Sequence, residues 1–341
     1  MKRTTAYVTA AILTASAMLA GCARGRELPM TTLSPKSDLA EWIYRLLIEV
    51  TLWDTLVFVV VITIFVLGLF VFSTRVGEAA PPSTAESDLK LEVAWTLGPA
   101  LILLMITIPT IRTIFRSQPN LPPAGSLQIE VVAHQWWWEF HYGDKNQIVT
   151  ANELHIPTGV PIRLNLRSAD VIHSFWVPQL GGKRDVVPGQ MNELTFIATI
   201  PGMYPGQCAE FCGESHANMR MRVFVETPQQ FAEWEKVQVT APPAAASITD
   251  PAAAAGAQAF ANSPCTTCHR IDGVSKGYMG PDLTHFGSRT TMAGAIEANN
   301  PADVAQWITN PAYVKPGAEM PALGLSGKNL DDLVAYLESL K

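Results

Sequence analysis

The sequence predicts a multidomain protein, in which a hairpin of two transmembrane helices precedes an all-β sandwich and a C-terminal all-α domain. Two apolar segments, 55–72 and 93–111, contain no charged residue. Residues 126–227 alternate short extended runs with proline and glycine turns, and an Ala/Pro-rich stretch separates them from the C-terminal segment. The 341 residues are 48% hydrophobic and 16% charged, against about 25% charged in average soluble chains. This composition excludes a wholly disordered chain and disfavours a plain soluble enzyme.

The charge is unevenly distributed along the chain. The formal net charge is −6, with +1 over residues 1–116, −4 over 117–249 and −3 over 250–341. A nucleic-acid-binding protein would normally show a basic face, so we expect no nucleic-acid partner. The acidic C-terminal two-thirds is suited to a basic partner protein.

The N-terminus predicts a signal peptide over residues 1–21. Lys2 and Arg3 precede an apolar stretch from Ala6 to Ala20, and small residues follow, which is the layout of a secretory signal. The ending Leu19-Ala20-Gly21-Cys22 resembles the lipobox of bacterial lipoproteins. The resemblance implies cleavage before Cys22 and lipidation of its sulfur. The alternative is an ordinary signal peptide with a chance cysteine.

The segment 22–116 is expected to hold two spans, at about 53–73 and 93–114. About 20 residues cross the hydrocarbon core of a bilayer. Gly98-Pro99 and Pro109 lie in the second segment, which indicates packing against neighbouring helices. Lys and Arg do not favour a cytoplasmic loop between the spans. The signal peptide exports the N-terminus, so we expect everything after about residue 116 to lie outside the cytoplasm.

Residues 117–236 are predicted to form the all-β domain. Many short strands separated by regular turns indicate a sandwich or barrel. The extended candidates are 127–133, 162–166, 194–200 and 220–225.

The segment from Cys208 to Met219 has the spacing C-x3-C-x3-H-x2-M. Thiolate, imidazole and thioether are ligands that suit copper. A second histidine would complete two trigonal sites, and His173 is the candidate. Two bridging thiolates would spread each electron over two copper ions, which predicts an electron-transfer centre. The alternatives are a Cys208–Cys212 disulfide or a zinc site.

The residues from His173 to Asp185 and from Cys208 to Met219 closely resemble subunit II of haem–copper oxidases. The resemblance covers about residues 35–235. It implies a cupredoxin-like sandwich with a binuclear copper A centre, in which Glu210 adds its backbone carbonyl to one copper. Its side chain would hold a magnesium ion shared with subunit I. The implied copper ligands are His173, Cys208, Glu210, Cys212, His216 and Met219.

The same resemblance assigns roles outside the ligands. Trp136, the first of three adjacent tryptophans, would be the point where electrons enter, and Glu92 would lie at a proton pathway. Core packing is the alternative for the tryptophans and our expectation for the other two; a helix-start carboxylate is the alternative for Glu92. Lys183 and Asp185 would face subunit I, unless they form a solvated turn.

The C-terminal region is predicted to be a linker, 237–250, followed by a haem domain, 251–341. Cys265-Thr-Thr-Cys268-His269 is the haem c attachment signature, in which His269 is the proximal iron ligand. A thioredoxin-like redox pair is the alternative, disfavoured by the adjacent histidine. Met320 resembles the axial methionine of class I cytochromes c, whereas Met279 is expected in the core. Gly256 and Phe260 would lie where the first and last helices cross.

Together these parts resemble subunit II of caa-type cytochrome c oxidases. The resemblance implies transfer from an external cytochrome c or another periplasmic donor to haem c, then to copper A and to haem in subunit I. There oxygen is reduced to water with proton translocation, so no catalytic residue is expected in this chain. Subunits I and III and membrane lipid are the other expected partners, with both domains on the periplasmic side of a bacterial inner membrane. The alternatives are a copper-A nitric oxide reductase or a membrane-anchored copper carrier.

Overall fold

The computed structural model describes residues 25, 28–71, 88–117, 123–143, 148–242 and 247–341. The signal peptide and Cys22 therefore lie outside the described residues. Two compact units divide the chain: one comprises 1–40 with 120–341, and the other comprises 41–119.

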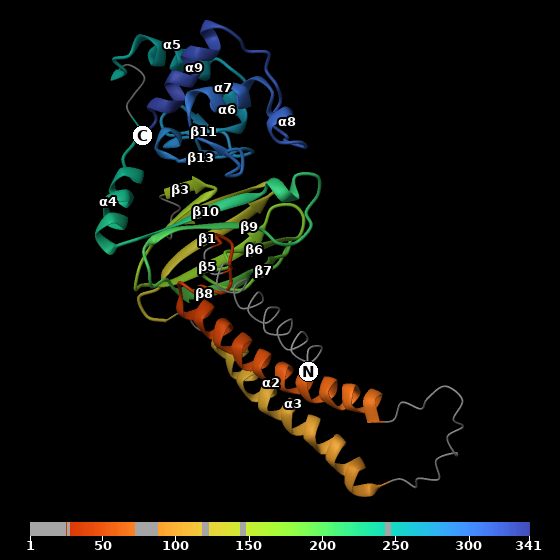
Figure 1. Cartoon of the computed structure of the whole chain (residues 1–341). Coiled ribbons are helices and arrows are strands. Elements are labelled where there is room, and N and C mark those ends of the chain that lie inside the picture. The colour runs from red at the N-terminus through yellow and green to blue at the C-terminus, as the bar shows by residue number, and fades with distance from the viewer. Residues whose placement is uncertain (1–24, 26–27, 72–87, 118–122, 144–147, 243–246) are drawn as a thin grey trace, which may run out of the picture. The chain divides into compact units, whose positions relative to one another are not determined.

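The smaller unit consists of two long apolar helices, α2 (Asp38–Val71) and α3 (Leu89–Ser117) (Figure 1). Both are long and apolar enough to cross a membrane. Arg116 near the end of α3 lies over the ring of Trp42 near the start of α2, so the helices run antiparallel. Each helix begins before the predicted span, because α-helical hydrogen bonding continues into the more polar residues 38–52 and 89–92.

The β-domain is a sandwich of two five-stranded sheets (Figure 1). The first sheet has the strand order β3-β2-β1-β5-β8, and the second has the order β4-β10-β9-β6-β7. The strands are β1 (Leu127–His134), β2 (Trp137–Tyr142), β3 (Ile148–Ala151), β4 (Glu153–Pro157), β5 (Pro161–Ser168), β6 (His173–Trp176), β7 (Arg184–Val186), β8 (Asn192–Ile197), β9 (Gly202–Cys208) and β10 (Arg220–Glu226).

Period-two alternation explains why these strands close on one core. In β5, Ile162, Leu164 and Leu166 are fully buried, whereas the residues between them are only half-buried. Successive side chains of a strand point to opposite faces. Each sheet therefore has one apolar face, and the apolar faces of the two sheets pack together.

One helix in this region was not predicted. Helix α4 (Pro228–Gln238) begins at Thr227, whose hydroxyl accepts from the amide of Gln230, and the Gln230 side chain accepts from the amide of Thr227. This capping box, with Pro228 in the first helical position, was present in the sequence as a start signal. The predicted linker 237–250 thus begins inside a helix.

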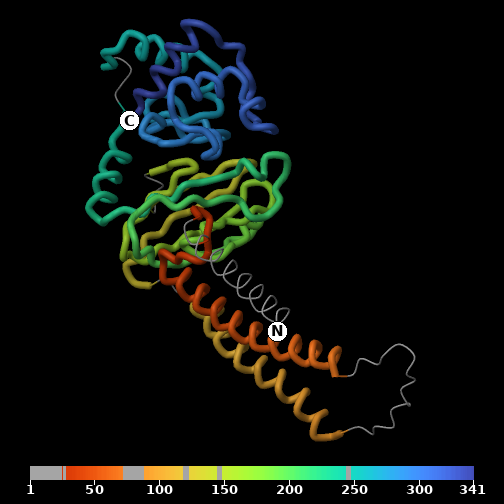
Figure 2. Tube along the Cα trace, in the orientation of Figure 1, coloured from red at the N-terminus to blue at the C-terminus, as the bar shows by residue number. Residues whose placement is uncertain are grey.

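The C-terminal domain, predicted to hold haem and called the haem domain below, is built on two crossed helices, α5 (Pro251–Ala261) and α9 (Lys328–Ser339), at the teal and dark-blue end of the trace (Figure 2). A Cβ atom on Gly256 would lie 1.9 Å from the carbonyl oxygen of Asp332, so only glycine permits this crossing. Phe260 and Tyr336 pack beside it, with ring centroids 6.0 Å apart. Shorter elements complete the domain: α6 (Cys265–Cys268), β11 (Arg270–Ile271), β12 (Ser275–Lys276), η3 (Phe286–Ser288), β13 (Thr291–Met292), β14 (Glu297–Ala298), α7 (Pro301–Thr309) and α8 (Pro311–Val314).

Candidate metal centre and haem cavity

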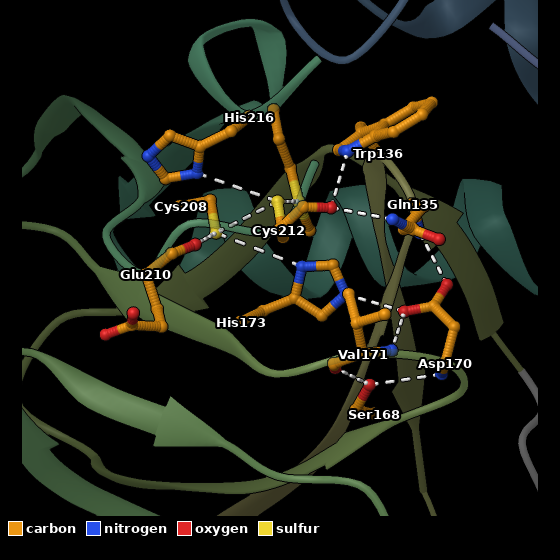
Figure 3. A network of polar contacts seen from close by, with 11 residues as sticks. Gln135, Trp136, Ser168, Asp170, Val171, His173, Cys208, Glu210, Cys212 and His216 are labelled. Atoms are coloured by element: carbon orange, nitrogen blue, oxygen red, sulfur yellow. Dashed lines mark hydrogen bonds and ion pairs between the residues drawn. The ribbon is translucent and has the colours of Figure 1, made fainter. Parts of the chain in front are cut away.

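The predicted copper ligands converge on two buried thiols. The Cys208 and Cys212 sulfurs are 3.8 Å apart. His173 Nδ1 lies 3.9 Å and the Glu210 carbonyl oxygen 3.2 Å from the Cys208 sulfur. On the other side, His216 Nδ1 lies 3.6 Å and the Met219 thioether 3.9 Å from the Cys212 sulfur. The donors thus form two halves that share a pair of sulfurs (Figure 3).

Pairing between strands brings these distant residues together. His173 begins β6, and two residues later Phe175 pairs with Cys208 at the end of β9. The connection from β9 to β10 then carries Glu210, Cys212 and the short helix η1 (His216–Asn218). Cys208, Cys212 and Met219 are at most 3% exposed, so the centre is enclosed by protein.

Asp170 contacts a predicted metal ligand and was not among the residues that the sequence indicated. Its carboxylate lies 2.7 Å from His173 Nε2 and accepts from the backbone amides of Gln135 and Val171. Because a carboxylate only accepts, the contact assigns the imidazole proton to Nε2, and the Nδ1 lone pair then faces Cys208. Carboxylates commonly orient metal-binding histidines in this way. The i, i+3 spacing of Asp170 and His173 was the available signal.

The two thiols titrate as a pair. The hydrogen bond from Cys212 lowers the pKa of Cys208 despite its burial. Donation to the Cys208 thiolate raises the pKa of Cys212. A lone thiolate is the form that attracts a metal cation, and a cation between the sulfurs favours loss of the second proton. Both cysteines are free, which disagrees with the disulfide alternative.

The Glu210 carboxylate points away from the sulfurs, whereas its carbonyl points toward them (Figure 3). Asp185 is exposed in β7, and the Lys183 ammonium lies over the Trp176 ring, 5.7 Å from its centroid. All three residues belong to the sandwich. Glu92 lies in the first turn of α3, in the other unit.

The three tryptophans occupy different environments. Trp138 is fully buried in the sandwich core, as expected. Trp137 is not in the core: it is half-buried and stacks on His134, with ring centroids 4.2 Å apart. Trp136 lies in a turn between β1 and β2 rather than on a strand, so the three side chains do not alternate as predicted. Its indole N–H donates to the carbonyl of Cys212 at 3.0 Å.

The haem domain contains a cavity of about 380 Å³, and Cys265, Cys268 and His269 all line it. His269 Nδ1 lies 2.8 Å from the Pro281 carbonyl oxygen, which leaves Nε2 free for iron. Burial lowers the pKa of His269, so the ring is neutral, as an iron ligand must be. A Cβ atom on Gly280 would lie 2.7 Å from the imidazole. These residues fit a covalently attached haem.

Three methionines, Met279, Met292 and Met320, line the same cavity. Met279 is 66% exposed, so its expected place in the core was wrong. Met292 is buried in β13. Met320 is half-buried and packs against the core of the domain. Trp136 and Gln135 of the sandwich also line the cavity, which therefore extends to the residues that contact the thiol centre.

Three protein families match successive parts of the chain. Residues 34–113 match the family described as "Cytochrome C oxidase subunit II, transmembrane domain". Residues 143–226 match "Cytochrome C oxidase subunit II, periplasmic domain", and residues 253–341 match "Cytochrome c".

Similar proteins cover nearly the whole chain. Cytochrome c oxidase subunit 2 of Alkalihalophilus pseudofirmus is 36% identical over 95% of this chain and 94% of its own. That of Bacillus subtilis is 33% identical over the same shares. Among solved structures, the periplasmic domain of cytochrome oxidase subunit II from Bradyrhizobium japonicum is 33% identical. That match covers 35% of this chain and 96% of the other, with a TM-score of 0.33.

Proposed function

The chain belongs to the family of cytochrome c oxidase subunit II, and we propose on that basis a route for electrons through its residues. Membership implies a copper-binding domain and haem c, a subunit I partner and a cytochrome c donor. The proposed route runs from the donor to the haem domain, through Trp136 to the thiol centre, and on to haem in subunit I. Oxygen reduction and proton translocation then belong to the partner.

The thiol centre is proposed to hold two copper ions. His173, Cys208 and the Glu210 carbonyl would serve one ion, and Cys212, His216 and Met219 the other, with both thiolates shared. The single observation that carries this proposal is the placement of two imidazole Nδ1 atoms on opposite sides of a sulfur pair. When bound, such a pair takes up and releases single electrons. Enclosure by protein ligands keeps substrates away, so the centre is suited to transfer rather than to catalysis.

Cys265 and Cys268 are proposed to attach the haem covalently. They lie three residues apart in one helical turn, which presents both sulfurs on the same side. His269 would supply one axial nitrogen and Met320 the other axial ligand. Histidine–methionine ligation raises a haem potential, as an electron carrier requires.

Trp136 is proposed to connect the two centres. Its indole N–H reaches the carbonyl of the ligand Cys212, and the same residue lines the haem cavity. A continuous covalent and hydrogen-bonded path therefore joins the cavity wall to the thiol centre.

The remaining assignments concern the membrane and subunit I. Two spans with both soluble domains outside the cytoplasm are proposed for a bacterial inner membrane, with Cys22 as the lipidated N-terminus. Glu92 is proposed at the mouth of a proton pathway. The Glu210 carboxylate, directed away from the thiols, is proposed to hold magnesium with subunit I. Subunit III is a further proposed partner.

The test uses the native complex purified through this subunit. We expect two copper ions in this chain and a reduced-minus-oxidised spectrum with a-type and c-type haem bands. Only b-type and c-type bands would favour a nitric oxide reductase. The variant Asp170→Asn should weaken copper retention against a chelator by about 10- to 100-fold, whereas Asp185→Asn, an exposed control in β7, should retain copper normally. Equal retention by the two variants would contradict the proposed role of Asp170 in orienting His173.

A further inference from the structure

The haem domain and the sandwich belong to one compact unit and share a polar interface. We call this surface the docking interface. On the sandwich it comprises Trp136, Glu153, Ser215, Arg220 and Arg222, and on the haem domain Thr290, Thr291, Ala293, Gly294, Lys315, Pro316 and Gly317.

Glu153 is the centre of the docking interface. This first residue of β4 is only 2% exposed, and its carboxylate accepts from the amide and hydroxyl of both Thr290 and Thr291, at 2.6 to 2.9 Å. All four donors belong to the other domain. A buried carboxylate without hydrogen-bond donors is strongly unfavourable. In the docked arrangement Glu153 is therefore a buried acid whose donors are supplied by the haem domain.

Lys315 forms a second anchor on the haem domain. It is 4% exposed, and its ammonium donates to the carbonyls of Trp136 and Ala293. Trp136 therefore contacts both sides: its carbonyl accepts from Lys315, and its indole N–H donates to the Cys212 carbonyl. Lys315 thus joins the haem domain to Trp136, the residue through which electrons are proposed to pass.

A strained hairpin tip also lies in the docking interface. Ala293 and Ala295 have φ of 54° and 59° on either side of Gly294, at 80°, a conformation that is unfavourable for alanine. The Gly294 carbonyl accepts from the amide of Arg220 at 3.0 Å. A Cβ atom on Gly294 would lie 2.7 Å from the Asn218 carbonyl oxygen. Strained backbone persists only where its surroundings hold it. This tip is held by its contacts with Arg220 and with the connection 209–219 between β9 and β10, which we call the copper loop.

The docked haem domain covers Trp136. A Cβ atom on Gly317 would lie 3.0 Å from the Trp136 ring, and a Cβ atom on Gly213 of the copper loop would lie 3.1 Å from it. Ser215 of that loop donates to the Pro316 carbonyl at 2.6 Å. Trp136 is only half-buried in this arrangement, but the loop 315–317 lies against its ring and competes for that place with any soluble protein.

From this geometry we propose that Glu153 and Lys315 are positioning residues that hold the chain's own haem domain on Trp136 and so exclude external donors from the copper domain. The proposal rests on the proposed electron route. It adds that electrons reach the copper centre from the chain's own haem domain and not from an external donor. The attached domain is both the donor to the copper centre and the cover over its entrance. A soluble cytochrome then delivers electrons only to haem c.

The first test measures amide hydrogen exchange in the assembled oxidase. The amides of Thr290, Thr291 and Arg220 all donate across the docking interface, so they report docking without any electron transfer. Glu153→Gln removes the buried charge, and we expect these amides to exchange about tenfold faster or more. The paired variant Thr290→Val/Thr291→Val removes two hydroxyl donors from the opposite side and should act in the same direction. Glu130→Gln, on the other sheet beside Arg167, is the matched control.

The second test follows reduction by a soluble cytochrome c in the same complexes. In the wild type we expect haem c to be reduced first and the copper centre afterwards. In the combined variant Glu153→Gln/Lys315→Met we expect slower transfer from haem c and direct reduction of the copper centre in parallel. Unchanged exchange in both Glu153 and threonine variants would overturn the anchor. Faster exchange with an unchanged order of reduction would overturn the exclusion of donors. If the wild type transferred no electrons from haem c to copper while exchange still responded, the electron route would fail and the anchor would stand.

Discussion

At the scale of single residues, carboxylates contact several of the histidines of the sandwich and differ in what these contacts do. Asp170 orients His173 toward the thiols and lies outside the proposed ligand set. Glu139 on β2 instead lies between two histidines, 3.2 Å from Nε2 of both His134 and His141. Burial alone would raise the pKa of Glu139, but the hydrogen bond with His134 and the ion-pair contact with His141 lower it to about 2.

This shift predicts an acid-dependent contribution to stability. A carboxyl group with a pKa of 4.5 when unfolded and about 2 when folded stabilises the fold above pH 4.5, and the stabilisation disappears as the pH falls towards 2. The shift corresponds to about 3 kcal/mol at most. We expect the stability advantage of the wild type over Glu139→Gln to shrink by about this amount between pH 5 and pH 2. Denaturant unfolding of the sandwich, followed by tryptophan fluorescence, measures it; a pH-independent difference would contradict the assignment.

At the scale of elements, the crossing of α5 and α9 depends on close backbone approach. Replacing Gly256 by alanine would improve helix propensity by about 1 kcal/mol. The added Cβ would, however, meet the Asp332 carbonyl oxygen at 1.9 Å, and a backbone atom cannot rotate away as a flexible side chain can. Overpacking of this kind costs about 1–3 kcal/mol or more, so the clash outweighs the gain in propensity.

We therefore expect Gly256→Ala to lower the melting temperature of the haem domain and to reduce covalent haem incorporation. Gln258→Ala, on the exposed side of the same helix, is the control and should change neither. Thermal unfolding followed at the haem absorbance measures the first effect, and the haem content of the purified chain measures the second. A Gly256→Ala protein as stable as the control would show that the helices separate without cost.

At the scale of the whole molecule, charge determines how an external donor meets the chain. Residues 250–341 carry a formal net charge of −3, whereas the contacts within the docking interface are short and largely buried. Exposed charges are screened over about 8 Å at physiological ionic strength, and buried contacts are screened much less.

These differences predict two salt dependences in one complex. The bimolecular rate of haem c reduction by a basic cytochrome c should fall steeply as ionic strength rises, because the attraction that steers the encounter is screened. The subsequent transfer from haem c to the copper centre should change little, because the docked domain does not need to find its partner. Stopped-flow reduction at several salt concentrations separates the two steps. A salt-insensitive first step would contradict a basic donor.

Local patterns in the sequence were sufficient for much of the fold and of the chemistry. Two uncharged apolar segments predicted both long helices, and short extended runs between proline and glycine turns predicted β1, β5, β8 and β10 to within three residues at each end. The spacing of Cys208, Cys212, His216 and Met219 predicted a centre built on two thiols, because side chains on one short loop necessarily lie near one another. Helix α4 was missed only because its capping box was not considered.

Contacts between distant segments required the tertiary structure. Asp170, which contacts His173, also accepts from the amide of Gln135, 35 positions away. The donors on Glu153 lie up to 138 positions from it along the chain. The turn at Trp136 was likewise not predicted. No periodicity records such pairs, because they arise from strand pairing and domain docking rather than from neighbours along the chain. The sequence by itself thus determined the two long apolar helices and the candidate ligands on the segment from Cys208 to Met219. The tertiary structure decided how the centres face each other, since only folding brings the haem domain and Trp136 into contact.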